Sequence, residues 1–253
     1  MPVIPAERLF AGLEAATATL AEVVGRSDQA LRIPACPDWS LRQLATHVGR
    51  AHRWGAEIVS TRSTAFIEFR AVPDGKAPEG AAGQAAWLTA GAARLITAVR
   101  SAGDDAVWAF GKLQPATFWA RRMAHETLVH GADVALAAGG AIAIPADLAA
   151  DAIDEWLTVM SPLNDGQNDL ASILPAGTTL GVHATDGGAG WHVTHGSDGV
   201  TVLPGYGGAD VTLSGPAADV LLVLMRRLPV TTASVGVTGE TALLDRWLEL
   251  TAF

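Results

Sequence analysis

The chain has 253 residues, of which 49% are hydrophobic and 17% are charged, and this length and composition predict a sizeable core and exclude wholesale disorder. A formal net charge of −9 argues against a nucleic-acid-binding protein, which would carry a basic patch or stripe, and against binding to an anionic membrane surface. The single cysteine, Cys36, excludes a disulfide bond within the chain.

The first predicted element is a helix over residues 5–25, where Leu9, Leu13, Leu20 and other apolar residues recur at helical spacing. Acidic residues interrupt this stretch, so a signal peptide is not expected. No run in the sequence approaches the ~18–20 apolar residues of a membrane span. We therefore expect a soluble, cytoplasmic protein that does not bind a membrane.

Three further helices are predicted in the first half of the chain. The second helix is capped by Ser40, with Gln43 completing a capping box. A loop rich in proline and glycine, residues 62–80, separates it from a third helix at about residues 81–101. After a connector, a fourth helix is predicted over residues 117–138.

Together these helices predict an N-terminal all-α four-helix bundle over residues 1–142 and a second domain over residues 143–253. The second domain starts with a helix at residues 146–160, and short alternating runs separated by glycines follow it. A helix over residues 216–228, a short strand and a closing helix complete an α+β fold with a mostly antiparallel sheet. The predicted strands of the alternating region read "TTLGVHAT", "GWHVTHG", "GVTVLPG" and "ADVTLSG".

Two of the predicted helices turn side chains of metal-ligand type toward the bundle core. In "MAHETLVHGADVA", residues 123–135, Glu126 and His130 are four positions apart and share the inward face of the fourth helix. His47 lies in the apolar stripe of the second helix and also faces inward. Two imidazoles and a carboxylate are the ligands of an open catalytic metal site, and facing helices of a bundle can build one. A metal ion would also compensate the burial of Glu126 in its ionised form.

The same residues allow a simpler interpretation. An inward histidine is more often hydrogen-bonded within a core than bound to a metal, and a Glu/His pair one turn apart can bond to itself on a partly wet face. His125 and His52 point about 100–140° away from the inward face, and we interpret them as solvated or interhelical hydrogen-bonding residues. Cys36 is interpreted as a packed residue, with a reactive thiol as the alternative.

Two motifs carry a resemblance to a known family. The segment "CPDWSLRQLATHVGRAH" and the later segment "ARRMAHETLVHGADV" together resemble the mycothiol-dependent maleylpyruvate isomerase family, a branch of the DinB-like metal-binding four-helix bundles. The C-terminal segment that begins "WHVTHGSDGVTVLPG" resembles the second domain of that family, which is similar to sterol carrier proteins. The resemblance covers nearly the whole chain, but it does not single out one reaction within the family.

This resemblance implies zinc, or another divalent metal, held by His47, Glu126 and His130, and mycothiol as a thiol cofactor or co-substrate. It also implies a catalytic arginine in the second domain. We expect Arg227 in this role, with Arg226 as the alternative, although arginines near a helix end can simply stabilise that end. The inward stripes of the bundle show few basic residues, and Arg121 and Arg122 are expected mostly on outward or flanking faces.

The function implied is that of a zinc-dependent, mycothiol-using isomerase or thiol S-transferase. It would act on a small electrophile or an organic acid and would use the external thiol as a metal-bound thiolate. Two alternatives remain open from the sequence. One is a metal-dependent hydrolase at the same site, and the other is a non-enzymatic protein that binds a small lipid-like ligand.

Overall fold

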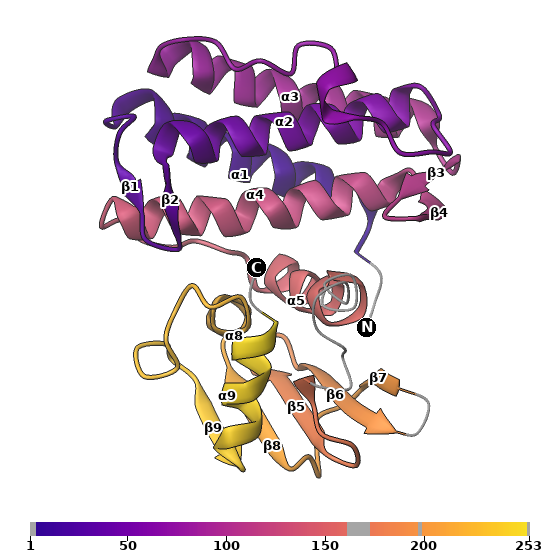
Figure 1. The fold of residues 1–253 in the computed structure, drawn as a ribbon, viewed down its shortest axis with the longest axis vertical. Helices are drawn as coiled ribbons and strands as arrows, with labels where there is room; N and C mark the ends of the chain where they lie inside the picture. Colours follow the sequence, from indigo (N-terminus) through magenta and orange to yellow (C-terminus); the bar gives the residue numbers. More distant parts are fainter. Residues whose placement is uncertain (1–3, 161–172, 197–198, 252–253) are drawn as a thin grey trace. The chain divides into compact units, whose positions relative to one another are not determined.

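The computed structural model of the protein describes residues 4–160, 173–196 and 199–251. The chain divides into two compact units, with the N-terminal unit running from Ile4 to Ala143 and the C-terminal unit starting at Ile144 (Figure 1). The N-terminal unit is mainly helical and the C-terminal unit combines helices with one sheet. The predicted fold class is therefore confirmed.

Four long helices run side by side in the N-terminal unit. The helix α1 packs on α3 and α4, and α2 packs on the same two helices. Every helix thus has two principal neighbours, and apolar side chains fill the space enclosed by the four. The four helices are α1 (Ala6–Arg26), α2 (Leu41–Ser60), α3 (Ala81–Ala102) and α4 (Thr117–Ala137).

The start of α2 is fixed by the predicted capping box. The Ser40 side chain accepts a hydrogen bond from the backbone N–H of Gln43, and the Gln43 side chain accepts one from the backbone N–H of Ser40. Within the helix, a Cβ at Gly49 would come within 2.1 Å of the Trp87 ring, so this glycine lets α2 and α3 approach closely. The cap and the close packing together set the register in which α2 presents its side chains to the core.

The connectors before α2 and α4 form two small antiparallel hairpins, which the sequence pattern did not predict. The first hairpin places Cys36 and Trp39 beside the start of α2. The loop predicted over residues 62–80 contains a single 3-10 turn at Phe69–Ala71. The hairpin strands are β1 (Arg32–Ile33), β2 (Cys36–Ser40), β3 (Ala106–Ala109) and β4 (Lys112–Pro115).

The described part of the C-terminal unit contains a five-stranded sheet in the order β7-β6-β5-β8-β9. All neighbouring strands are antiparallel except β5 and β8, so the prediction of a mostly antiparallel sheet is correct. Alternate strand residues such as Leu180, Val182 and Val193 are buried, which explains the period of two in the sequence. The strands are β5 (Thr179–Ala184), β6 (Ala189–Gly196), β7 (Gly199–Pro204), β8 (Val211–Gly215) and β9 (Gly236–Gly239).

Two helices of this unit differ from the prediction. The helix expected over residues 146–160 consists of α5 (Ala146–Glu155) and a π-helical turn (Trp156–Met160). The helix α8 (Ala217–Leu224) ends four residues before the predicted end at residue 228, and α9 (Thr241–Leu250) closes the described chain.

The early end of α8 has a specific backbone cause. Arg226 adopts a left-handed conformation with φ of 59°, and the backbone N–H of Arg227 donates to the carbonyl of Leu222 at 2.7 Å. The left-handed residue and this hydrogen bond together close the helix end. Pro229 lies two residues further and could not continue a helix. The prediction of a helix through Arg227 is therefore wrong.

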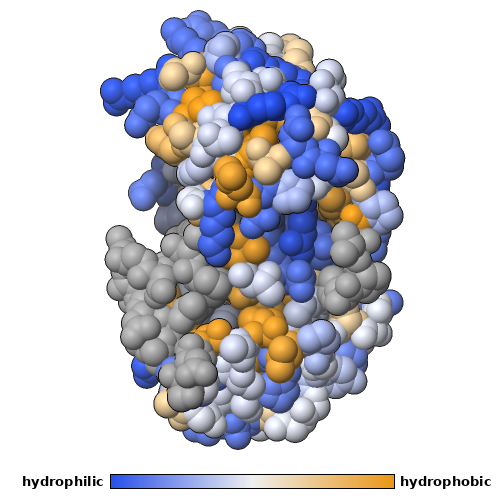
Figure 2. All heavy atoms as spheres, turned by 90° about the vertical axis from the view of Figure 1, so that its right-hand side faces the viewer, coloured by the Kyte–Doolittle hydropathy of each residue, from blue (hydrophilic) through white to orange (hydrophobic). Residues whose placement is uncertain are grey.

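Apolar side chains are not confined to the interior. Figure 2 shows apolar patches among hydrophilic side chains on one face of the molecule, and the exposed large hydrophobic residues include Phe66, Phe69 and Leu113. Within the described ranges, no helix is both long enough and apolar enough to cross a membrane.

Candidate metal centre

The structure brings His47, Glu126 and His130 together between α2 and α4. The His47 Nε2–H donates to Glu126 Oε1 at 2.7 Å, and His130 Nε2 lies 3.3 Å from the same oxygen. One ligand atom from each residue lies within 4.8 Å of the other two. The inward face assigned to these three residues from the sequence is therefore the face on which they meet.

The electrostatics of this cluster suit a cation. Burial raises the pKa of the Glu126 carboxyl, but Arg122, His130 and His47 outweigh that effect and hold its pKa well below the usual range. Burial lowers the pKa of His130, whereas hydrogen bonds and charges from Asp133 and Glu126 raise it to about 9. A carboxylate thus faces two imidazole nitrogens, and the raised pKa of His130 favours its protonated form. A divalent cation could take the place of the protons, and a set of two nitrogens and one oxygen fits zinc.

Asp133 holds His130 from the side away from Glu126. Its Oδ2 accepts a hydrogen bond from His130 Nδ1–H at 2.9 Å, and Asp133 is fully buried. A proton fixed on Nδ1 leaves Nε2 as the nitrogen available to a metal, an arrangement common among metal-binding histidines. Asp133 was not among the predicted site residues, although its position three residues after His130 places the two on one helix face.

Replacing Asp133 by alanine is expected to weaken metal binding by about 10- to 100-fold, because His130 loses the partner that fixes its tautomer and orientation. Competition with a coloured chelator would measure the dissociation constant. Asp133→Asn, whose amide oxygen still accepts a hydrogen bond, should lose less metal affinity than Asp133→Ala. Unchanged affinity in Asp133→Ala would show that the hydrogen bond has no role in metal binding.

Arg122 lies beside Glu126, contrary to the expectation from the sequence. It was expected on an outward or flanking face, but it is buried, and its Nη2 donates to Glu126 Oε2. A buried guanidinium needs a carboxylate partner, and Glu126 lies one turn further along α4. The expectation of an outward or flanking position is therefore wrong for Arg122.

The aromatic ring of Trp39 covers the two imidazoles. Its centroid lies 4.8 Å from that of His47 and 6.1 Å from that of His130. The His47 side chain is nevertheless 40% exposed and Glu126 is 20% exposed. The site is thus partly sheltered and partly exposed.

The interpretation of His52 and His125 is partly corrected. Neither belongs to the group of His47, Glu126 and His130, but both are buried and not solvated. His52 Nε2 lies 2.8 Å from Thr127 Oγ1, which joins α2 to α4. The interhelical hydrogen bond expected of such residues is therefore present for His52.

Cys36 approaches the same region from β2. Its sulfur lies within 4.8 Å of ligand atoms of His130 and Asp133, forming a second group of metal-ligand type among the described residues. His130 Nδ1 and Asp133 Oδ2 in this group are already joined by a hydrogen bond. The atoms that converge on one carboxylate oxygen belong to the first group, so we place the candidate metal centre there.

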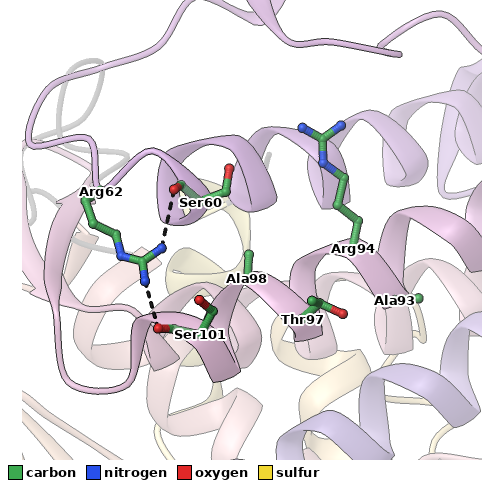
Figure 3. A pocket seen from close by; sticks show the side chains of 7 residues that line it. All are labelled: Ser60, Arg62, Ala93, Arg94, Thr97, Ala98 and Ser101. Atoms are coloured by element: carbon green, nitrogen blue, oxygen red, sulfur yellow. Dashed lines mark hydrogen bonds between the residues drawn. The ribbon is translucent and has the colours of Figure 1, made fainter.

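A separate groove of about 440 Å³ lies between α2 and α3 (Figure 3). Arg62 donates to the carbonyls of Ser60 and Ser101, and Arg94 pairs with Glu57 at 2.6 Å. Both arginines are engaged, and none of the predicted ligands is here. The groove is lined by Ser60, Arg62, Ala93, Arg94, Thr97, Ala98 and Ser101.

The two C-terminal arginines lie in the turn that follows α8. Arg227 Nη1 donates to the Met225 carbonyl at 2.8 Å, and Arg226 holds the left-handed position of that turn. These contacts agree with a role in closing the helix. The catalytic role expected of Arg227 stays a prediction.

Comparisons with known proteins agree with this architecture. The model of the "Mycothiol maleylpyruvate isomerase N-terminal domain" matches residues 10–135, and that of the "MDMPI C-terminal domain" matches residues 147–246. No curated protein matches the chain.

Two solved structures share the fold over most of both chains. One is the mycothiol-dependent maleylpyruvate isomerase, at 17% identity, and the other is a histidine-to-alanine mutant of mycothiol-dependent maleylpyruvate isomerase, at 16% identity. Each covers 94% of this chain and 95% of its own, with a TM-score of 0.63. Since the two domain models match consecutively along nearly the whole sequence, the chain belongs to the mycothiol-dependent maleylpyruvate isomerase family.

Proposed function

We propose that the protein is a zinc-dependent isomerase or thiol S-transferase that uses mycothiol, with the metal held by His47, Glu126 and His130. The observation that carries the proposal is the convergence of both Nε2 atoms on Glu126 Oε1. Zinc bound there would lower the pKa of a coordinated thiol, so that the thiol is present as a thiolate at neutral pH.

The residues around this centre have separable tasks in the proposal. His47 and His130 provide neutral nitrogen ligands from two different helices, and Asp133 fixes the orientation of His130. Trp39 shelters the imidazoles on one side, while the exposed part of His47 leaves an approach for a thiol. The nucleophilic sulfur is expected from mycothiol, because Cys36 is the protein's only cysteine and does not belong to the group of His47, Glu126 and His130.

Metal analysis and a thiol assay test this proposal together. Protein purified without chelators is expected to contain about one zinc ion per chain, as in catalytic zinc sites with three protein ligands. With an activated electrophile or a cis-unsaturated organic acid, turnover should require mycothiol. Turnover with water alone would indicate a hydrolase instead, and a protein without metal would contradict the proposed centre.

We further propose that Arg227 supplies a cation to an anionic substrate. Arg227→Ala is expected to lower turnover by roughly 10²-fold, as for loss of one donor that stabilises the transition state, while metal content stays the same. Arg227→Lys should restore activity only in part if the contact uses two N–H groups. Arg226→Ala is measured beside it, because Arg226 is the alternative for this role. Normal turnover in both alanine variants would assign these arginines to the helix end alone.

A further inference from the structure

The two oxygens of Glu126 have different partners. Oε1 accepts from His47 and lies near His130 Nε2, whereas Oε2 accepts from Arg122 Nη2. The Arg122 side chain is 7% exposed and that of Glu126 is 20% exposed, so this ion pair is largely shielded from water. A metal held by the two histidines would therefore meet one oxygen of the carboxylate, and the guanidinium already holds the other.

We infer that Arg122 is a positioning residue that confines Glu126 to a single metal-bound oxygen. This inference rests on the proposed metal centre. A carboxylate can bind a metal through one oxygen or through both, and a second oxygen would occupy a position that a catalytic zinc site keeps for substrate. By holding Oε2, Arg122 leaves that position to an external ligand such as a thiol.

The positive charge of Arg122 also favours the binding of an external ligand to the metal. Its guanidinium neutralises part of the negative charge that Glu126 offers, so the bound metal stays a stronger Lewis acid. The same charge lowers the affinity of the site for the metal, because a cation near a divalent ion repels it. At an effective dielectric constant of about 20, repulsion over a few ångströms outweighs the loss of one orienting hydrogen bond.

Asp133 lies on the same helix and carries a charge opposite to that of Arg122, so the two residues can be compared. Both residues orient a proposed ligand, Arg122 through Glu126 and Asp133 through His130. If orientation alone mattered, neutralising either residue would weaken metal binding. If the charge of Arg122 matters as inferred, Arg122→Gln strengthens metal binding while Asp133→Asn weakens it.

Cobalt(II) titration of the metal-free full chain tests the inference. Arg122→Gln is expected to bind cobalt(II) at least about tenfold more tightly than the wild type. Its visible bands should shift and weaken as Glu126 Oε2 joins the coordination sphere. Arg121→Gln, at the preceding position, should match the wild type in affinity and spectrum. Arg122→Lys keeps the charge and should return the affinity to within about threefold of wild type.

Weaker binding or a wild-type spectrum in Arg122→Gln would overturn the inference. If that variant does not fold, as judged by circular dichroism, Arg122→Met removes the same charge with a side chain suited to a buried position and is measured in its place. Failure of the proposed function gives a different result. In that case the wild type binds no cobalt(II), or His130→Ala binds it as tightly as the wild type.

Discussion

His130→Ala is expected to weaken metal binding by roughly 10²- to 10³-fold, because one of three protein ligands is lost and each ligand contributes a few kcal/mol in comparable zinc sites. Protein purified without chelators should then contain little zinc. The far-ultraviolet circular dichroism spectrum should keep its helical shape, since the substitution removes no part of the α4 backbone. Zinc measured by atomic emission gives the metal content directly.

His125→Gln is the matched control for this variant. His125 lies on the same helix and is also buried, so it reports the general effect of replacing a buried histidine in α4. It is expected to keep its metal. Full metal content in His130→Ala, or equal loss in both variants, would show that the helix register assigned to the metal centre is wrong.

The second large effect concerns His52 and acid stability. Burial lowers the pKa of His52 to about 4 from an ordinary value of 6.5. The unfolded chain therefore binds a proton at a higher pH than the folded chain does. The stability contributed by neutral His52 is fully present above about pH 6.5 and is lost as the pH falls toward 4. The expected loss from this group is about 3 kcal/mol in the free energy of unfolding.

His52→Gln separates this effect from other titrating groups. Glutamine does not titrate and can still hydrogen-bond to Thr127, so the variant should lose about 2 to 3 kcal/mol less than wild type between pH 7 and pH 4.5. Urea unfolding followed by circular dichroism at both values gives the comparison. Equal losses in the two proteins would mean that His52 is protonated in the folded state over this range.

The fold was largely predictable because its helices repeat one pattern over many turns. Apolar residues at helical spacing predicted the four bundle helices, and alternation predicted the strands of the C-terminal sheet. The short hairpins before α2 and α4 are too brief to show a period. The end of α8 was missed because apolar residues continue the helical pattern through Met225, while the left-handed turn at Arg226 has no signal in residue type.

Only those site residues that lie on the apolar face of a predicted helix could be identified from the sequence. His47 lies in the apolar stripe of α2, and Glu126 and His130 lie on the inward face of α4. These positions on two helices placed all three inward. Arg122 and His52 were placed outward because charged and polar residues usually face water. Both are buried because a partner compensates for the lost water, Glu126 for Arg122 and Thr127 for His52.

The spacing along α4 nevertheless contained a signal for Arg122 and Asp133. Arg122, Glu126, His130 and Asp133 follow one another at intervals of four, four and three residues, which places all four on one face of α4. An alternating series of opposite charges along one helix face predicts ion pairs. Whether the partners would be buried depended on α2 and β2 packing over that face, which spacing alone does not show.

Titration of mycothiol into zinc-loaded and metal-free protein tests the central claim most directly. The account predicts that zinc-loaded protein binds one mycothiol per chain, that the metal-free protein binds it at least about tenfold more weakly, and that zinc-loaded His125→Gln behaves as the wild type. Equal affinity with and without zinc would contradict the claim that the metal at His47, Glu126 and His130 binds the thiol.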